Sequence, residues 1–272
     1  MELNISLAPE ILFKIGSFPV SNSFFWMVVV SISLMILILT IRYKFKQVPG
    51  RTQAAFEILI EGGLDFVQSI IEDKDIAKKV FPLVFTLFLF IMLANLITFI
   101  PGSAVVLESG EGKVSLFRAV MSDYGIVIVM TLVAVITAQI VAIISFGPFG
   151  YLGKYFNFSG MKEFFSELFR GKLKFGLLAQ GFLDIFLGLM DIVGEIAKIV
   201  SLSFRLFGNI FAGEVLGMVM LFLMPWFLPL PFQFLSLLTA VVQAFVFAVL
   251  TLMFISLALK IDDEDLNEKA TV

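Results

Sequence analysis

Apolar runs long enough to cross a bilayer recur along the whole chain and limit the folds open to it. A helix needs about 20 residues to cross a hydrocarbon core about 30 Å thick. The 272 residues are 60% hydrophobic, with a mean hydropathy of +1.03. We therefore predict an all-α polytopic membrane protein that forms a single membrane domain, 1–272. Its membrane helices, about five in number, are expected at residues 23–41, 80–100, 124–146, about 176–224 and 232–259.

The charges between these runs predict the orientation of the chain. A basic cluster follows the first run: Arg42, Lys44, Lys46 and Arg51. The positive-inside rule places such a cluster in the cytoplasm, so segment 1–22 is expected outside. That segment has no basic region followed by an apolar core, which argues against a cleaved signal peptide. The basic loop between residues 154 and 174 and the acidic tail 260–272 are both expected in the cytoplasm.

Three further regions have patterns that a simple membrane span does not explain. Apolar and acidic residues alternate over 49–79, and 161–169 is a shorter stretch of the same kind. We expect both to form interfacial amphipathic helices. The apolar region 176–224 has no proline and is too long for one upright span. It is predicted to be either a helical hairpin or a short helix that leads into one long, tilted helix.

Arg205 places a positive charge inside this long apolar region. Its surroundings read Ser201-Leu-Ser-Phe-Arg-Leu-Phe-Gly-Asn-Ile-Phe-Ala-Gly-Glu214. Burying a charge at the centre of a bilayer costs about 2.5–3.5 kcal/mol on insertion scales, so such a residue faces protein or water and marks function by default. A guanidinium keeps its proton under all ordinary conditions, so Arg205 is expected to act as a fixed positive charge.

Other polar residues share one face of a helix with Arg205. At 100° per residue they lie within about 40° of Asp191, and they are Asp184, Asp191, Glu195, Lys198, Arg205 and Asn209. In a continuous helix this stripe is about 37 Å long. A line of small residues runs beside it, comprising Gly194, Ser201, Gly208 and Ala212. Such a line allows a neighbouring helix to approach closely.

The remaining polar residues of the spans lie elsewhere. Glu214 is on another face of the same helix and is expected to serve a different compartment or neighbour. Ser236 and Gln243 share a face of the last helix, and Asn95 and Thr98 lie near the end of the second span. A side chain of this kind more often makes an interhelical hydrogen bond than lines a channel.

Composition excludes several classes of function. The chain has no Cys and no His, so it offers no disulfide, no thiol nucleophile and no zinc or haem ligation. Its net charge is −3 and no basic block suggests nucleic-acid binding. The glycine-rich phosphate loop of nucleotide-binding enzymes is absent. We therefore expect no cofactor, no metal and no catalytic activity of the chain alone.

Three readings of the charged stripe remain at this point. It is an ion pathway, it is the carrier site of a secondary ion antiporter, or it is structural glue made of buried ion pairs such as Glu195 with Lys198. An antiporter would favour an inverted repeat, and none is evident. A structural scaffold would lose stability, but not ion flux, on mutation of Arg205.

The stretch around Arg205 resembles the signature of subunit a of the F-type ATP synthase, the membrane stator of a rotary motor. Arg-Leu-Phe-Gly-Asn followed by Ala-Gly-Glu carries this resemblance, and Gln243-Ala-Phe-Val-Phe in the last helix and Asn95 in the second span agree with it. It implies a bacterial-type inner membrane, partners in the subunit c ring and the peripheral stalk subunit b, and H⁺ or Na⁺ as the transported ion. It also implies that the last two long helices form a tilted, membrane-embedded hairpin.

The same resemblance implies roles for individual residues. Arg205 would face the carboxylates of the c ring with Gln243 close to it, and Glu214 would belong to the half-channel that opens to the outside. The half-channel to the cytoplasm would be lined by Asp191, Ser201 and Asn209. Ser236 stands where some members of the family carry a histidine. A titratable partner for Glu214 is thus missing, and water or another carboxylate would replace it.

Overall fold

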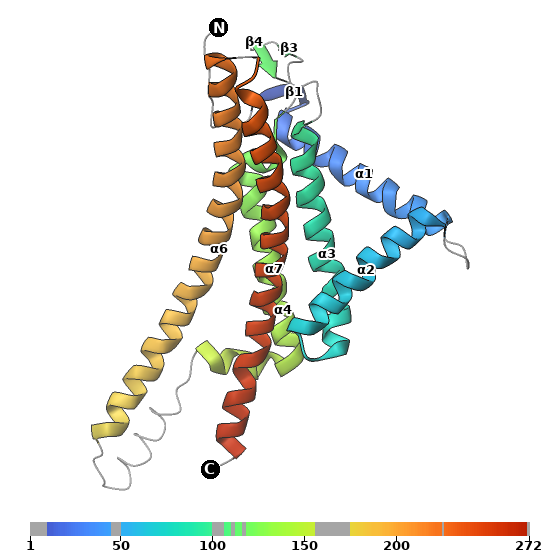
Figure 1. Ribbon diagram of the computed structural model, residues 1–272. Helices are drawn as coiled ribbons and strands as arrows, with labels where there is room; N and C mark the ends of the chain where they lie inside the picture. The colour runs from blue at the N-terminus through green and yellow to red at the C-terminus, as the bar shows by residue number, and fades with distance from the viewer. Residues whose placement is uncertain are drawn as a thin grey trace. The chain divides into compact units, whose positions relative to one another are not determined.

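Long helices make up most of the computed structural model of the chain (Figure 1). The structure describes residues 10–44, 50–99, 106–109, 112–115, 118–155, 175–224 and 226–270. The helices are α1 (Asn22–Lys44), α2 (Arg51–Ile70), α3 (Lys74–Leu96), α4 (Tyr124–Tyr155), α6 (Phe175–Leu223) and α7 (Pro229–Ala270), with short 3₁₀ turns η1 (Ile97–Phe99) and η2 (Val120–Ser122). Four short strands are β1 (Ile11–Ile15), β2 (Phe18–Ser21), β3 (Val106–Ser109) and β4 (Gly112–Ser115).

The predicted membrane spans are confirmed in number and kind. Within the described residues, 5 helices are long and apolar enough to cross a membrane: Asn22–Tyr43, Lys74–Leu96, Tyr124–Ser145, Phe186–Leu223 and Pro229–Leu259. The second span begins earlier than residue 80, because Asp73 caps the helix by accepting from the amides of Asp75 and Ile76 at 2.8 and 3.2 Å. The amphipathic segment 49–79 therefore forms α2 and the first turns of α3.

The long apolar region is a single helix and not a hairpin. α6 runs without a break from Phe175 to Leu223. Its 38-residue apolar part, Phe186–Leu223, is about 57 Å long at 1.5 Å per residue. That length exceeds the roughly 30 Å hydrocarbon core, so the helix must incline or project beyond the bilayer.

Two β-hairpins are features that the sequence did not suggest. β1 pairs with β2 antiparallel through a two-residue turn that begins at Gly16, whose φ of +63° suits such a tight hairpin. The hairpin leads directly into α1, where the Ser21 hydroxyl accepts the amide of Phe24 at 3.2 Å and caps the helix. β3 and β4 form the second antiparallel pair. The first hairpin lies in segment 1–22, which is expected outside the membrane.

The chain divides into two compact units, which we describe separately. Unit 1 comprises residues 1–130 and 203–253. In this unit α3 packs against the C-terminal part of α2 near its start and against the beginning of α1 near its end (Figure 1). η2 packs against both α1 and α3. Its fully buried side chains include Ile91, Met121, Leu206 and Phe247.

Unit 2 comprises residues 131–202 and 254–272. α4 is kinked at Gly147, where φ is 79° and ψ is 158°. The third span was expected to stop at this position, and a positive φ is available at little cost only to glycine. The interfacial helix expected at 161–169 lies outside the described residues, and so do the side chains of the acidic tail. That the chain forms a single membrane domain stays a prediction.

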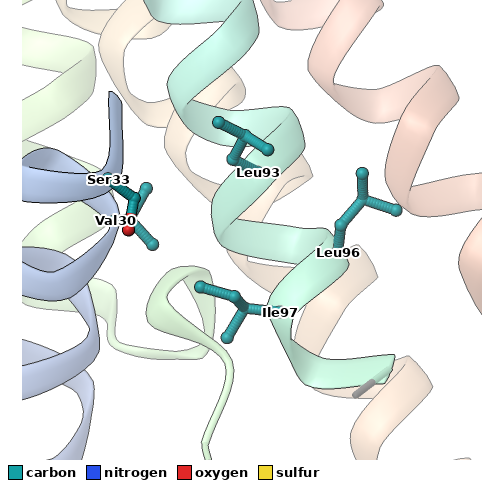
Figure 2. A pocket seen from close by; sticks show the side chains of 5 residues that line it. All are labelled: Val30, Ser33, Leu93, Leu96 and Ile97. Atoms are coloured by element: carbon teal, nitrogen blue, oxygen red, sulfur yellow. The ribbon is translucent and has the colours of Figure 1, made fainter. Parts of the chain in front are cut away.

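A pocket between α1 and α3 carries no charged group (Figure 2). Its volume is about 240 Å³ and it is lined by Val30, Ser33, Leu93, Leu96 and Ile97. Such an apolar lining fits a hydrocarbon chain and has no means of handling an ion. None of the polar residues that the sequence singles out on α6 and α7 lines this pocket.

Candidate functional site

Arg205 is exposed on α6 in unit 1. Leu206, the next residue of the helix, is fully buried. α6 therefore buries one face and presents the Arg205 guanidinium on another. Arg205 makes no ion pair or hydrogen bond with any residue that the structure describes. Its charge is therefore not neutralised by an ion pair within the described residues.

The small residues beside Arg205 are open as well. A Cβ built on Gly208 would meet nothing within 4 Å among the described atoms. Ala212 is exposed and Asn209 is half-buried. This face of α6 in unit 1 can therefore accept a close neighbour, because no side chain of the described part of the chain covers Gly208.

In unit 2 the polar stripe contains one ion pair. Lys198 Nζ lies 2.7 Å from Glu195 Oε1, and the two side chains are 28% and 20% exposed. Lys198 Nζ also lies 5.3 Å from the centroid of the Phe254 ring. An ammonium over an aromatic face is stabilised by the ring quadrupole. Glu195 and Lys198 are thus partners in the structure and not two isolated charges.

The other stripe residues of unit 2 are exposed. Asp191 and Ser201 both face outward, and neither makes a hydrogen bond within the described residues. A Cβ on Gly194 would also meet nothing within 4 Å in that part of the chain. The side chain of Asp184 lies outside the described residues.

α7 contributes buried polar groups to unit 1. Asn95 of α3 is 1% exposed and its Nδ2 donates to the carbonyl of Ala240 at 3.4 Å. Gln243 is 6% exposed, and its Nε2 has no hydrogen-bond acceptor among the described residues. Asn95 thus makes an interhelical bond to the α7 backbone one turn before Gln243. The closeness of Gln243 to Arg205 stays a prediction, since no hydrogen bond joins them here.

α6 and α7 approach closely beside Glu214. A Cβ built on Gly213 would lie 3.2 Å from the hydroxyl oxygen of Ser236. That distance is tighter than an ordinary van der Waals contact, so glycine permits the approach. Ser236 therefore lies next to the α6 turn that carries Glu214, which is where a histidine would stand in some members of the family resembled.

Glu214 has partners that the sequence did not reveal. The backbone amide of Ala119 donates to Glu214 Oε1 at 2.8 Å, across 95 residues of sequence. The charge of the Arg118 guanidinium also acts on this carboxylate, and the Ser122 hydroxyl accepts from Arg118 Nε at 3.1 Å. The sequence signal was Arg118 itself, a single basic residue just before the third span. A lone charge of this kind does not by itself indicate a partner in the linear sequence.

Among the described residues there is no group of three or more His, Cys, Asp or Glu side chains that could hold a metal ion.

Comparison with known proteins shows which family the chain resembles over most of its length. The family model described as "ATP synthase A chain" matches residues 23–256. Curated relatives include "ATP synthase subunit a" of Helicobacter hepaticus, 30% identical over 244 residues that cover 88% of this chain and 90% of the relative. "ATP synthase subunit a 2" of Vibrio campbellii is 32% identical, with coverages of 86% and 87%. The Nitratiruptor "ATP synthase subunit a" is 33% identical, with coverages of 82% and 83%.

These matches confirm the resemblance seen in the stretch around Arg205 and give no support to the antiporter alternative. They extend over the membrane helices and not over the signature alone. The chain therefore belongs to the ATP synthase A chain family, the multi-pass, ion-translocating stator subunits of the membrane sector of F-type ATP synthase.

Proposed function

We propose that this chain carries H⁺ or Na⁺ to and from the carboxylates of a subunit c ring through two offset half-channels, with Arg205 between them. The observation that carries the proposal is the exposed guanidinium of Arg205 in an apolar helix, without an ion-pair partner in the described residues. An intramembrane charge of this kind needs a partner. A carboxylate that arrives from a second subunit supplies one.

The step at Arg205 follows from the cost of a bare carboxylate in lipid. A ring site crosses the lipid only while a proton or Na⁺ neutralises its carboxyl group. Beside Arg205 the opposite charge favours the ionised carboxylate, so the site releases its ion there. Because the guanidinium keeps its proton, it also prevents protons from passing directly between the half-channels.

The remaining polar residues divide between the two half-channels. Asp191, Ser201 and Asn209 are assigned to the half-channel that opens to the cytoplasm, with the Glu195–Lys198 pair at its border. Glu214 is assigned to the half-channel that opens outside, with Ser236 beside it on α7. Asn95 joins α3 to α7, and Gln243, one turn further along α7, is assigned a place close to Arg205.

The open line of small residues on α6 supports a close helical partner. Gly194 and Gly208 have no described atom within 4 Å of an added Cβ, and such positions let helix backbones approach. We assign this face to the c ring, and the peripheral stalk subunit b to another surface. The setting is a bacterial inner membrane with the N-terminus outside and the C-terminus in the cytoplasm. ATP chemistry then takes place on other subunits, and this chain alone is not catalytic.

Replacement of Arg205 tests the proposal. In vesicles that contain the assembled complex, Arg205→Ala and Arg205→Lys are each expected to abolish ATP-driven ion pumping. Lysine is a different donor shape and can lose its proton, so it does not restore the barrier. Arg51→Gln is the control, since it removes an exposed arginine at the start of α2. Near-normal pumping by Arg205→Ala, in complexes that retain the chain, contradicts the proposal.

A further inference from the structure

A buried turn in front of α4 forms the surroundings of Glu214. Residues 118 and 119 lead into η2 (Val120–Ser122), and Ala119, Val120, Met121 and Ser122 are each at most 1% exposed. The turn packs against α1 and α3. A short segment so completely buried is held in one conformation by its neighbours, so the groups it presents have fixed positions.

Two groups of this turn act on one carboxylate. The Ala119 amide donates to Glu214 Oε1 at 2.8 Å, and the charge of Arg118 acts on the same group. Within the turn, Arg118 Nε donates to the Ser122 hydroxyl oxygen at 3.1 Å, and that hydroxyl donates to the Ala119 carbonyl at 2.9 Å. The position of the guanidinium is therefore set by the same turn that holds the carboxylate.

The turn supplies Glu214 with the hydrogen bond and the opposite charge that a carboxylate in a membrane helix lacks. Ionisation in apolar surroundings is costly unless opposite charge and hydrogen bonds offset the loss of water. Arg118 is the side chain whose charge acts on Glu214 among the described residues, and α7 presents the uncharged Ser236 nearby. Since a guanidinium does not exchange its proton, Arg118 can orient and stabilise Glu214 but cannot relay ions for it.

We propose that Arg118 is a positioning residue that acts through Glu214. It aims the carboxylate at the ion path on the outer side and lowers the cost of its ionised form, and Ser122 fixes Arg118 in place. The proposal rests on the assignment of Glu214 to the outer half-channel made above. In place of the water or second carboxylate expected beside Glu214, it supplies a permanent positive charge from a turn that lies about 95 residues away in the sequence.

The test compares single and double variants in vesicles that contain the assembled complex. Arg118→Gln is expected to slow ATP-driven pumping about tenfold, because a charge-assisted contact is lost. Arg118→Lys recovers part of the rate, since it keeps the charge but not the bond to Ser122. In a Glu214→Gln background, Arg118→Gln causes no further loss, because groups that act through one another are not additive.

Ser122→Ala is the milder variant if Arg118→Gln assembles poorly. It is expected to slow pumping several-fold when Glu214 is present and not at all in Glu214→Gln. Rates are given per assembled complex, and Arg51→Gln is the matched control for the loss of one positive charge. Normal pumping by both Arg118→Gln and Ser122→Ala overturns the proposal. It is also overturned if, in the double variants, the loss of pumping rate from either substitution multiplies with the loss from Glu214→Gln.

These outcomes differ from a failure of the proposed function. If Glu214→Gln alone pumps normally, the assignment of Glu214 is wrong and the inference about Arg118 falls with it. If Glu214→Gln is slow and Arg118→Gln is normal, the assignment of Glu214 stands and only the role of Arg118 is refuted.

Discussion

Replacing Glu214 separates its structural role from its role in ion transfer. The Ala119 amide is buried, with the residue 1% exposed, and its acceptor is Glu214 Oε1 at 2.8 Å. A hydrogen bond to an ionised acceptor contributes about 1.5–3 kcal/mol, and a neutral one contributes about 0.5–1.5 kcal/mol. Glu214→Gln keeps a neutral acceptor and should lower the free energy of opening this turn by roughly 1 kcal/mol. Glu214→Ala leaves a buried amide unsatisfied and should lower it by roughly 2 kcal/mol.

Amide hydrogen exchange in the assembled complex measures this difference. The opening of a local segment sets its exchange rate, and 1.36 kcal/mol corresponds to a factor of ten. The peptide that contains residues 118–123 should therefore exchange about 5-fold faster in Glu214→Gln and about 30-fold faster in Glu214→Ala. Glu61→Gln, an exposed carboxylate on α2, is the control and should leave this peptide unchanged.

Ion pumping should order the same variants differently. Both Glu214→Gln and Glu214→Ala remove the carboxylate that is proposed to transfer the ion, so both should pump slowly and to a similar degree. Equal exchange in the two variants and the wild type refutes the contact between Glu214 and the turn. Normal pumping by Glu214→Gln refutes the transfer role and leaves the contact intact.

Three glycines give further predictions. Gly208→Leu should leave the thermal stability of the chain unchanged, because a Cβ there meets no described atom within 4 Å outside the adjacent helix backbone. It should reduce ATP-driven pumping, because the added side chain would project towards the proposed ring. Normal pumping contradicts that contact. Gly213→Leu should instead lower stability by about 1–3 kcal/mol, since its Cβ would lie 3.2 Å from Ser236 Oγ, and an unchanged Tm contradicts the close approach of α6 and α7. Gly147→Ala should lower the stability by about 1–3 kcal/mol, because the φ of Gly147 is 79°. Gly62→Ala is the control in helix α2: apart from the adjacent helix backbone, a Cβ there would meet nothing within 4 Å among the described residues, so the Tm should not fall.

Much of the fold was predictable because it depends on local pattern. Hydropathy over about 20 residues identifies a membrane helix without knowledge of its neighbours, and the expected number of spans agrees with the 5 candidate spans of the described residues. The end of the third span followed from Gly147, since only glycine adopts its backbone conformation at little cost. Whether 176–224 is one helix or a hairpin was not decidable in this way, because a turn inside an apolar run need not contain proline. The N-terminal hairpin carries no alternating pattern strong enough to reveal it.

The functional site shows the same division. By itself, the sequence determined that Arg205 lies in an apolar helix, that polar and small residues share its side of α6, and which family the signature resembles. Helical periodicity and a charge within an apolar run both depend only on residues that are close together in the sequence, so the sequence alone reveals them. Only the tertiary structure decided which groups are partners. It joined Asn95 to Ala240 across 145 residues and Ala119 to Glu214 across 95. Contacts between segments so distant depend on how the helices pack, and no local pattern records that packing.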